Sequence, residues 1–216
     1  EIFTAPPMGD EGLSLGAAIL ASYKLGEWKH QPIKDVFFGF EYTDEQVMDA
    51  ALKFKVKAKG DYHNHTDFIQ SALQRKEIFG IFNGRFELGP RALGNRSVIM
   101  ETTDRGNHSY LNKRFGRDET MPFAPIVLKD KAKNVFDIKS SDFAAEFMTL
   151  CYNVKEEWKN KIPAVTHVDG SARYQSVTPE TNERFYRLIS KFNDMDINFW
   201  VKPGKGHHTG FAIQSI

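Results

Sequence analysis

The segment that most constrains this fold is Gly84–Ser97, which follows directly on the short apolar run Ile78–Phe82. It holds three glycines, three arginines and a proline, a density that disfavours both helix and strand, so we predict a loop fixed at the end of a strand. Glycine lets backbone N–H groups approach an anion, and guanidinium groups match phosphate oxygens bidentately. The loop is therefore a candidate phosphate site. The alternative is a tight structural turn whose arginines pair with Glu87 and nearby acids.

Two further segments have the same character. Asn112–Arg117 is a basic group at the end of a predicted helix, and His167–Gln175 leads from a predicted strand into a small-residue turn with one arginine. Basic side chains at a helix C-terminus are also favoured by the helix dipole, so a structural role for the first group is equally supported. Because each segment adjoins a predicted strand, we expect Arg91, Arg96 and Arg173 to converge on one concave site.

Four motifs of this chain together resemble the NodU/CmcH-type O-carbamoyltransferases. The strings GRFELGPRALGNRS, MPFAP and PAVTHVDGSARYQSV are similar to motifs of the family's C-terminal domain, and they occur in the same order. The string PPMGDEGLSLGAA resembles the closing motif of its N-terminal actin/Hsp70-like domain. The resemblance covers Pro6 to about Asn198.

The resemblance implies a two-step reaction divided between domains. A YrdC-like C-terminal domain would use ATP to activate carbamoyl phosphate as carbamoyl adenylate, with Mg²⁺ accompanying ATP. The N-terminal domain, with iron as the candidate transition metal, would pass the carbamoyl group to a hydroxyl of a small molecule. We expect residues 1–27 to be a remnant of that domain, residues 28–42 a linker, and residues 43–216 the YrdC-like domain.

Individual site residues follow from the matched motifs. The implied catalytic residues are Arg91, Arg96, Lys113 and Arg173. The implied substrate- and nucleotide-binding residues are Arg85, Gly94, Ser97, Arg117, His167 and Ser171, and Asp10 is the implied metal ligand. From local chemistry alone, His167 is better explained as a structural histidine. Asp169 serves equally well as a turn former or as a group that orients Arg173 or assists Mg²⁺.

The fold class expected from the pattern of elements is α/β (α+β), which the resemblance specifies as a YrdC-like twisted mixed sheet with flanking helices. A tightly packed helix is predicted over residues 12–23, and another opens at Thr43–Glu45 and runs to Lys53. The remaining predicted helices follow Asp67, follow Asp104, and span residues 180–192. The predicted strands are residues 78–82, 124–128, 147–154 and 164–168.

Charge and composition limit the partners. The 29 basic and 28 acidic residues nearly cancel, which disfavours broad nucleic-acid binding and leaves any anion site local. No apolar run is long enough to span a bilayer and no signal peptide is visible, so a cytoplasmic location is expected, with no membrane partner. The single cysteine, Cys151, lies in an apolar run and is predicted to be a buried core thiol. A homodimer is left open.

The chain also departs from the family pattern. Met121 stands where many members have arginine, and after Asn198 the sequence replaces a Leu-Asn-Thr-Ser-Phe-Asn segment with a Gly/Lys/His stretch. We therefore expect this chain alone to bind ATP weakly and to transfer no carbamoyl group. Two other readings stand beside the enzyme: a non-catalytic RNA-binding or regulatory YrdC-like domain, and an inactive structural remnant. The histidines of residues 61–67 and of residues 207–208 are not expected to hold a metal.

Overall fold

The computed structural model describes residues 6–56, 69, 71, 75, 77–118, 120, 122–139, 143–193 and 209–212. Its helices are α1 (Glu11–Lys24), α2 (Asp44–Lys53), α4 (Gly106–Arg114), α5 (Ala132–Val135), α6 (Glu156–Lys159) and α7 (Pro179–Asn193), with 3₁₀ helices η2 (Lys129–Lys131) and η3 (Phe143–Phe147). Its strands are β1 (Phe79–Phe82), β2 (Arg96–Ile99), β3 (Ala124–Leu128), β4 (Tyr152–Asn153), β5 (Ser171–Ala172), β6 (Gln175–Val177) and β7 (Thr209–Ala212).

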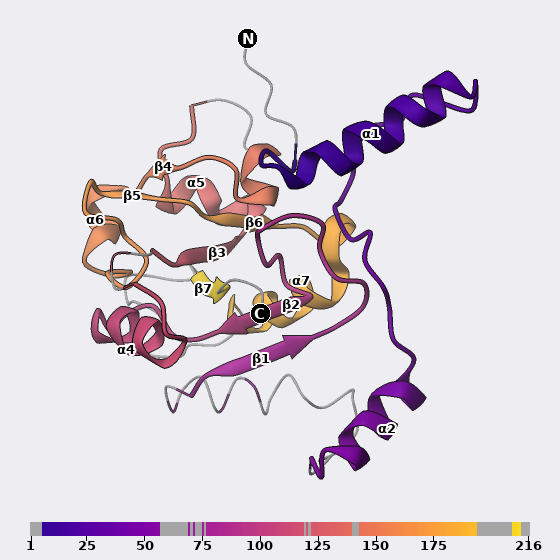
Figure 1. Ribbon diagram of the computed structural model, residues 1–216. Helices are drawn as coiled ribbons and strands as arrows, with labels where there is room; N and C mark the ends of the chain where they lie inside the picture. Colours follow the sequence, from indigo (N-terminus) through magenta and orange to yellow (C-terminus); the bar gives the residue numbers. More distant parts are fainter. Residues whose placement is uncertain are drawn as a thin grey trace.

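Strand β3 lies at the centre of the fold (Figure 1). All five of its residues are buried, as expected for an apolar run with neighbours on both edges. It pairs in parallel with β6, where Ile126 lies opposite Gln175, and antiparallel with β7, where Ile126 lies opposite Gly210. The sheet is therefore mixed, and the predicted α/β class is confirmed.

Strands β1 and β2 form a separate antiparallel pair, with Phe79 opposite Ile99 and Phe82 opposite Arg96. The predicted strand at residues 78–82 is thus confirmed, and the glycine- and arginine-rich segment is the loop that joins the pair. Helix α7, also predicted, buries Phe185 and Ile189 against apolar side chains of β2, β3 and β6. This packing places the start of α7 beside the loop.

A second apolar core lies on the other side of the molecule. Tyr174, fully buried, stacks on Phe136 with ring centroids 4.2 Å apart and an interplanar angle of 5°. Trp158 of α6 and Val127 of β3 belong to the same cluster. Because Tyr174 is anchored in this core, the backbone of its neighbour Arg173 is held between β5 and β6.

The two N-terminal helices lie at the periphery (Figure 1). Helix α1 has the predicted extent, but it buries no residue, and Leu13 is 73% exposed. The prediction of a tightly packed helix is wrong because no described segment covers its small and apolar side chains. Helix α2 is confirmed, with Thr43 and Gln46 forming a capping box, and it too buries no residue.

Two predicted strands are wrong for local backbone reasons. Within residues 147–154, Met148 has a φ of +52°, which interrupts an extended chain, so η3 gives way to a turn and only Tyr152–Asn153 form a strand. Within residues 164–168, the N–H groups of Val165 and Thr166 donate back to the carbonyl of Ile162, so the segment turns. Cys151 follows the first of these turns and is exposed, which corrects its predicted burial.

Other expectations fall partly or wholly outside the described residues. These are most of the helix predicted after Asp67, the histidines of residues 61–67 and 207–208, and Met121. Asp104 does assist the start of α4, since its carboxylate accepts a hydrogen bond from the Gly106 N–H at 2.9 Å. Among the described residues, none of the helices combines the length and apolar character needed to cross a membrane.

Candidate functional site: an unneutralised arginine cavity

The loop between β1 and β2 is organised by its own carboxylate. Glu87 is buried, and its Oε1 accepts hydrogen bonds from the backbone N–H groups of Leu93 at 2.7 Å, Asn95 at 2.9 Å and Arg96 at 3.3 Å. The N–H group of Gly94 donates to Ser97 Oγ at 2.9 Å. Four of the backbone donors that we expected to cradle a phosphate are therefore already occupied, and Glu87 forms no ion pair with the arginines as the alternative had it.

Arg96 is also committed to the loop. Its Nη1 donates to the carbonyls of Asn83 at 2.6 Å and Asn95 at 3.1 Å, and its Nη2 donates to Gly84 O at 3.1 Å. Its guanidinium carbon lies 3.7 Å from the ring centroid of Phe82. The side chain closes the two ends of the loop on each other, and it lines an open aromatic pocket of about 720 Å³ with Tyr42, Phe82 and Phe86.

Residues that are distant in the sequence also hold this loop in place. Gly94 has a φ of +109°, and a Cβ there would lie 2.3 Å from the ring of Phe185 in α7. Asn182 Nδ2 donates to Asn95 Oδ1 at 2.9 Å, and Gln175 Nε2 of β6 donates to the Leu93 carbonyl at 2.9 Å. The loop therefore has a defined conformation and presents Arg91 in a defined place.

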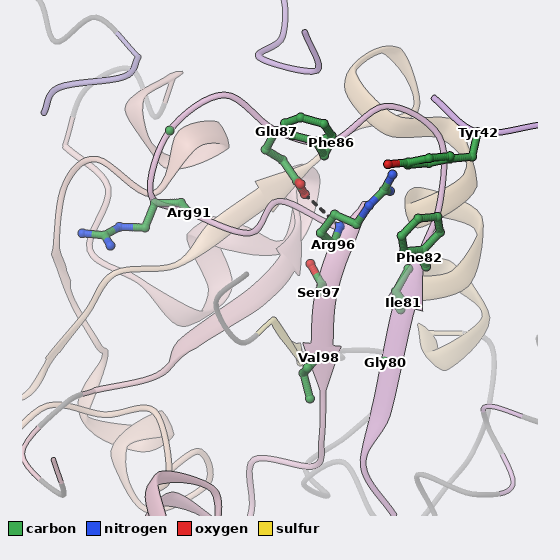
Figure 2. Close-up of a pocket in the computed structure, with 11 residues that line it drawn as sticks. Tyr42, Gly80, Ile81, Phe82, Phe86, Glu87, Arg91, Arg96, Ser97 and Val98 are labelled. Carbon is green, nitrogen blue, oxygen red and sulfur yellow. Dashed lines mark hydrogen bonds between the residues drawn. The ribbon is translucent and has the colours of Figure 1, made fainter. Parts of the chain in front are cut away.

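Arg91 points away from Arg96, as Figure 2 shows. Together with Arg173 it lines a second cavity of about 290 Å³, at the low end of the range for small-molecule sites. We call this the arginine cavity; its walls are Pro6, Pro7, Met8, Gly9, Glu11, Val36, Leu88, Pro90, Arg91, Leu93, Phe147, Met148, Thr149 and Arg173. Arg91 also lines the aromatic pocket beside Arg96, so it borders both spaces. Arg173 and Arg96 line different pockets, and the prediction that all three arginines converge on one site is therefore wrong.

Among the described residues, no acid forms an ion pair with the guanidinium groups at this cavity. Arg173 Nε is buried and makes no hydrogen bond. Arg117 does not line the cavity, but its Nη1 is also buried without a partner, and its guanidinium carbon lies 4.8 Å from the ring centroid of Phe123. Burial lowers the pKa of Arg173, and the positive charge of Arg91 lowers it further; Cys151 raises it and Arg117 lowers it. Burial and then Arg91 also lower the pKa of Arg117. The positive charges of Arg91, Arg117 and Arg173 thus repel one another, and none of them forms an ion pair with a described acid.

A polar turn borders the cluster. Asp169 accepts a hydrogen bond from the Ser171 N–H at 2.9 Å, which, with the Ser171 hydroxyl, lowers the pKa of the Asp169 carboxyl and confirms its turn-forming role. His167 Nδ1 lies 3.1 Å from Ser171 Oγ. Burial lowers the pKa of His167; Asp169 acts against this shift, and Arg173 adds to it. His167 and Ser171 are therefore engaged with each other, within electrostatic reach of Arg173.

The other predicted residues lie elsewhere. Arg85 Nε donates to the Gly39 carbonyl at 3.2 Å, and Lys113 is exposed on the last turn of α4. Asp10 is exposed at the start of α1, and no group of three metal-capable side chains exists within the described part of the chain. The role of Asp10 as a metal ligand therefore stays a prediction.

Sequence reasoning missed several residues that shape the site. Glu87 was read only as a partner for arginines, although an acid inside a glycine-rich loop is also suited to bind backbone N–H groups. Gln175 and Asn182 act on the loop from more than 80 positions away, as the separations of 82 and 87 residues show. No local sequence signal marks such contacts.

The carbamoyltransferase C-terminus family matches residues 70–200, which is more than half of the chain and includes Arg91, Arg117 and Arg173. The chain belongs to the carbamoyltransferase C-terminus family. The match also ends close to Asn198, where the sequence leaves the family pattern.

Relatives of this carbamoyltransferase-family chain come from archaea and bacteria. Nodulation protein NolO of Bradyrhizobium diazoefficiens is 32% identical over 89% of the chain and 36% of its own length. The 3'-hydroxymethylcephem-O-carbamoyltransferase of Streptomyces clavuligerus is 35% identical over 88% of the chain and 34% of its own length. A Methanocaldococcus jannaschii protein is 32% identical over 90% of the chain. The chain spans about a third of the length of these relatives.

Proposed function

We propose that this chain is the carbamoyl-activating part of an O-carbamoyltransferase, in which carbamoyl phosphate binds the arginine cavity and reacts with ATP. The observation that carries the proposal is the pair of arginines with buried donors that lack partners, Arg173 and Arg117, both within electrostatic reach of Arg91. An unpaired buried charge destabilises a fold, and such groups are frequent at functional sites. A phosphate group would supply the missing acceptors.

The proposed reaction requires a positively charged site. Carbamoyl phosphate would first lose its phosphate to water, which gives carbamate and inorganic phosphate. In adenylation an oxygen of the carbamate then bonds to the α-phosphorus of ATP, and the bond from that phosphorus to pyrophosphate breaks. Two polyanions must approach each other, so fixed positive groups are needed to offset their repulsion and to stabilise the developing charge. Arg91 and Arg173 would hold the phosphate of carbamoyl phosphate, and Arg117 would add positive potential beside them.

The remaining partners of the reaction belong to the proposal as well. Mg²⁺ bound to ATP needs few protein carboxylates, because it keeps water and phosphate ligands. The hydroxyl acceptor would be a small molecule, by analogy with the cephem substrate in the printed name of the Streptomyces clavuligerus relative. Transfer to it would take place in the N-terminal domain that the resemblance implies.

Calorimetric titration with carbamoyl phosphate tests the site. We expect Arg173→Ala to weaken binding by about 1.5–3 kcal/mol, the range for hydrogen bonds to charged groups, while the far-ultraviolet circular dichroism stays unchanged. Arg187→Ala is the matched control, since Arg187 is an exposed arginine of α7 paired with Glu183. An unchanged dissociation constant for Arg173→Ala would remove Arg173 from the site. Pyrophosphate release by the full-length protein, with ATP and carbamoyl phosphate, tests the adenylation step.

A further inference from the structure

The arginine cavity has one wall of opposite charge. Glu11, in the first turn of α1, lines it together with Arg91 and Arg173. Its side chain lies against the Gly84–Ser97 loop, because a Cβ added to Gly89 would be 3.7 Å from Glu11 Cγ and 3.8 Å from Oε1. The cavity is therefore lined by several parts of the chain that are distant in the sequence, and the N-terminal part contributes an acid.

The contacts of Glu11 do not explain its position. An acid in the first turn of a helix is ordinarily accounted for by the helix dipole. Here, however, Oε1 is buried and accepts no hydrogen bond, and Glu11 forms no ion pair with Arg91 or Arg173 anywhere in the described chain. A buried oxygen without a donor is unfavourable, and a nearby pair of guanidinium groups that does not neutralise it is more unusual still. The opposite charges share one cavity and remain apart.

Such a cavity suits a small ligand with two unlike ends. Its guanidinium groups take an anionic end, and its carboxylate oxygen takes a hydrogen-bond donor. A symmetrical anion satisfies only the arginines and is repelled by the acid. Carbamoyl phosphate carries a phosphate at one end and an NH₂ group at the other, so it matches both.

We propose that Glu11 is a specificity-determining residue that accepts a hydrogen bond from the carbamoyl NH₂ group and so selects carbamoyl phosphate over acyl phosphates of the same shape. The inference rests on the proposed function, because it takes the arginine cavity as the carbamoyl phosphate site. Acetyl phosphate is the decisive probe, since it replaces the NH₂ group by a methyl group of similar size. A site that hydrogen-bonds a substrate N–H group rejects an analogue without it, because the buried acceptor is left unpaired.

The experiment measures dissociation constants of carbamoyl phosphate, acetyl phosphate and inorganic phosphate for the 216-residue chain by calorimetry. We expect the wild type to prefer carbamoyl phosphate over acetyl phosphate by roughly tenfold or more, as for a hydrogen bond to a charged group. Glu11→Ala should reduce this preference to about twofold or less, and it should tighten inorganic phosphate binding by removing a negative charge. Glu11→Gln keeps the side-chain shape and one acceptor, so it should fall between the two.

Glu27→Gln is the matched control, because it removes one negative charge from an exposed position beyond the end of α1. It should leave all three constants unchanged. If Glu11 has a purely structural role, Glu11→Ala would weaken the binding of all three ligands by the same factor. The ratios of their dissociation constants would then stay unchanged, and the inference would be overturned. Equal binding of carbamoyl and acetyl phosphate by the wild type would overturn it too, while the proposed function stands. If the wild type binds none of the three ligands, the proposed function fails first, and the inference fails with it.

Discussion

Arg96 and Arg173 are both arginines beside strands, yet they stand in opposite electrostatic situations. Arg96 donates to three backbone carbonyls and stacks on Phe82, so its side chain is part of the loop. Arg173 has a buried Nε without an acceptor and faces the like charges of Arg91 and Arg117. The contrast separates an arginine that builds the fold from one whose hydrogen-bonding capacity is left for a ligand.

The same substitution at both positions tests whether the two arginines differ in this way. We expect Arg96→Met to lower the free energy of unfolding by about 2 kcal/mol, because three carbonyls lose their donor and the contact with Phe82 loses its charge. Urea denaturation measures the change. A loss below about 0.5 kcal/mol, as expected of a surface site, would mean that Arg96 does not hold the loop.

At Arg173 we expect the same substitution to change the free energy of unfolding in the opposite direction. Arg173→Met should raise the free energy of unfolding of the ligand-free protein by at most about 1 kcal/mol, because it removes a half-buried charge whose repulsion with Arg91 is partly screened by water. The added stability that phosphate gives to the wild type should disappear in the same variant. Thermal melts with and without phosphate, at matched ionic strength, measure both effects. Destabilisation of the ligand-free variant would show that Arg173 has a structural partner.

The smallest expected effect is the pH dependence of stability that His167, beside Arg173, contributes. His167 has a pKa lowered from its ordinary 6.5 by burial; Asp169 opposes this shift and Arg173 adds to it. The folded protein therefore binds fewer protons than the unfolded chain below pH 6.5, so stability should fall as the pH drops through this window. We expect the wild type to lose more stability than His167→Gln between pH 7 and 5.5.

Nuclear magnetic resonance titration of the imidazole checks the same point directly. The midpoint should lie below 6.5 in the free protein and should rise when phosphate binds, because an anion beside Arg173 offsets the positive charge that His167 faces. A midpoint that phosphate does not move would place the bound anion away from Arg173.

Local sequence signals predicted the parts of the fold that depend on local physics. The apolar run at residues 124–128 and the amphipathic pattern of α7 each specify one element, and the capping box at Thr43 marks the start of α2. The strand predicted at residues 147–154 failed because an apolar run does not report the positive φ of Met148. The short strand at Tyr152–Asn153 lacks any period of its own.

The site divides in the same way. Arg91 and Arg173 could be found from composition and motif, because anion-suited side chains gather in loops that follow strands. The commitment of Arg96 to backbone carbonyls, and the contribution of Glu11 to the cavity wall, depend on how distant segments pack. That information is not local, so the sequence alone predicted three converging arginines and the structure brings together a different three.

The carboxylate of Glu87 has one further consequence, for the thermodynamics of binding. Because the loop already holds an internal anion on the N–H groups of Leu93, Asn95 and Arg96, its conformational entropy is lost during folding and not at ligand capture. Association should then need no loop closure, and its rate should be governed by charge steering into the cavity. Such capture is fast at low ionic strength and slows steeply as salt screens the arginines.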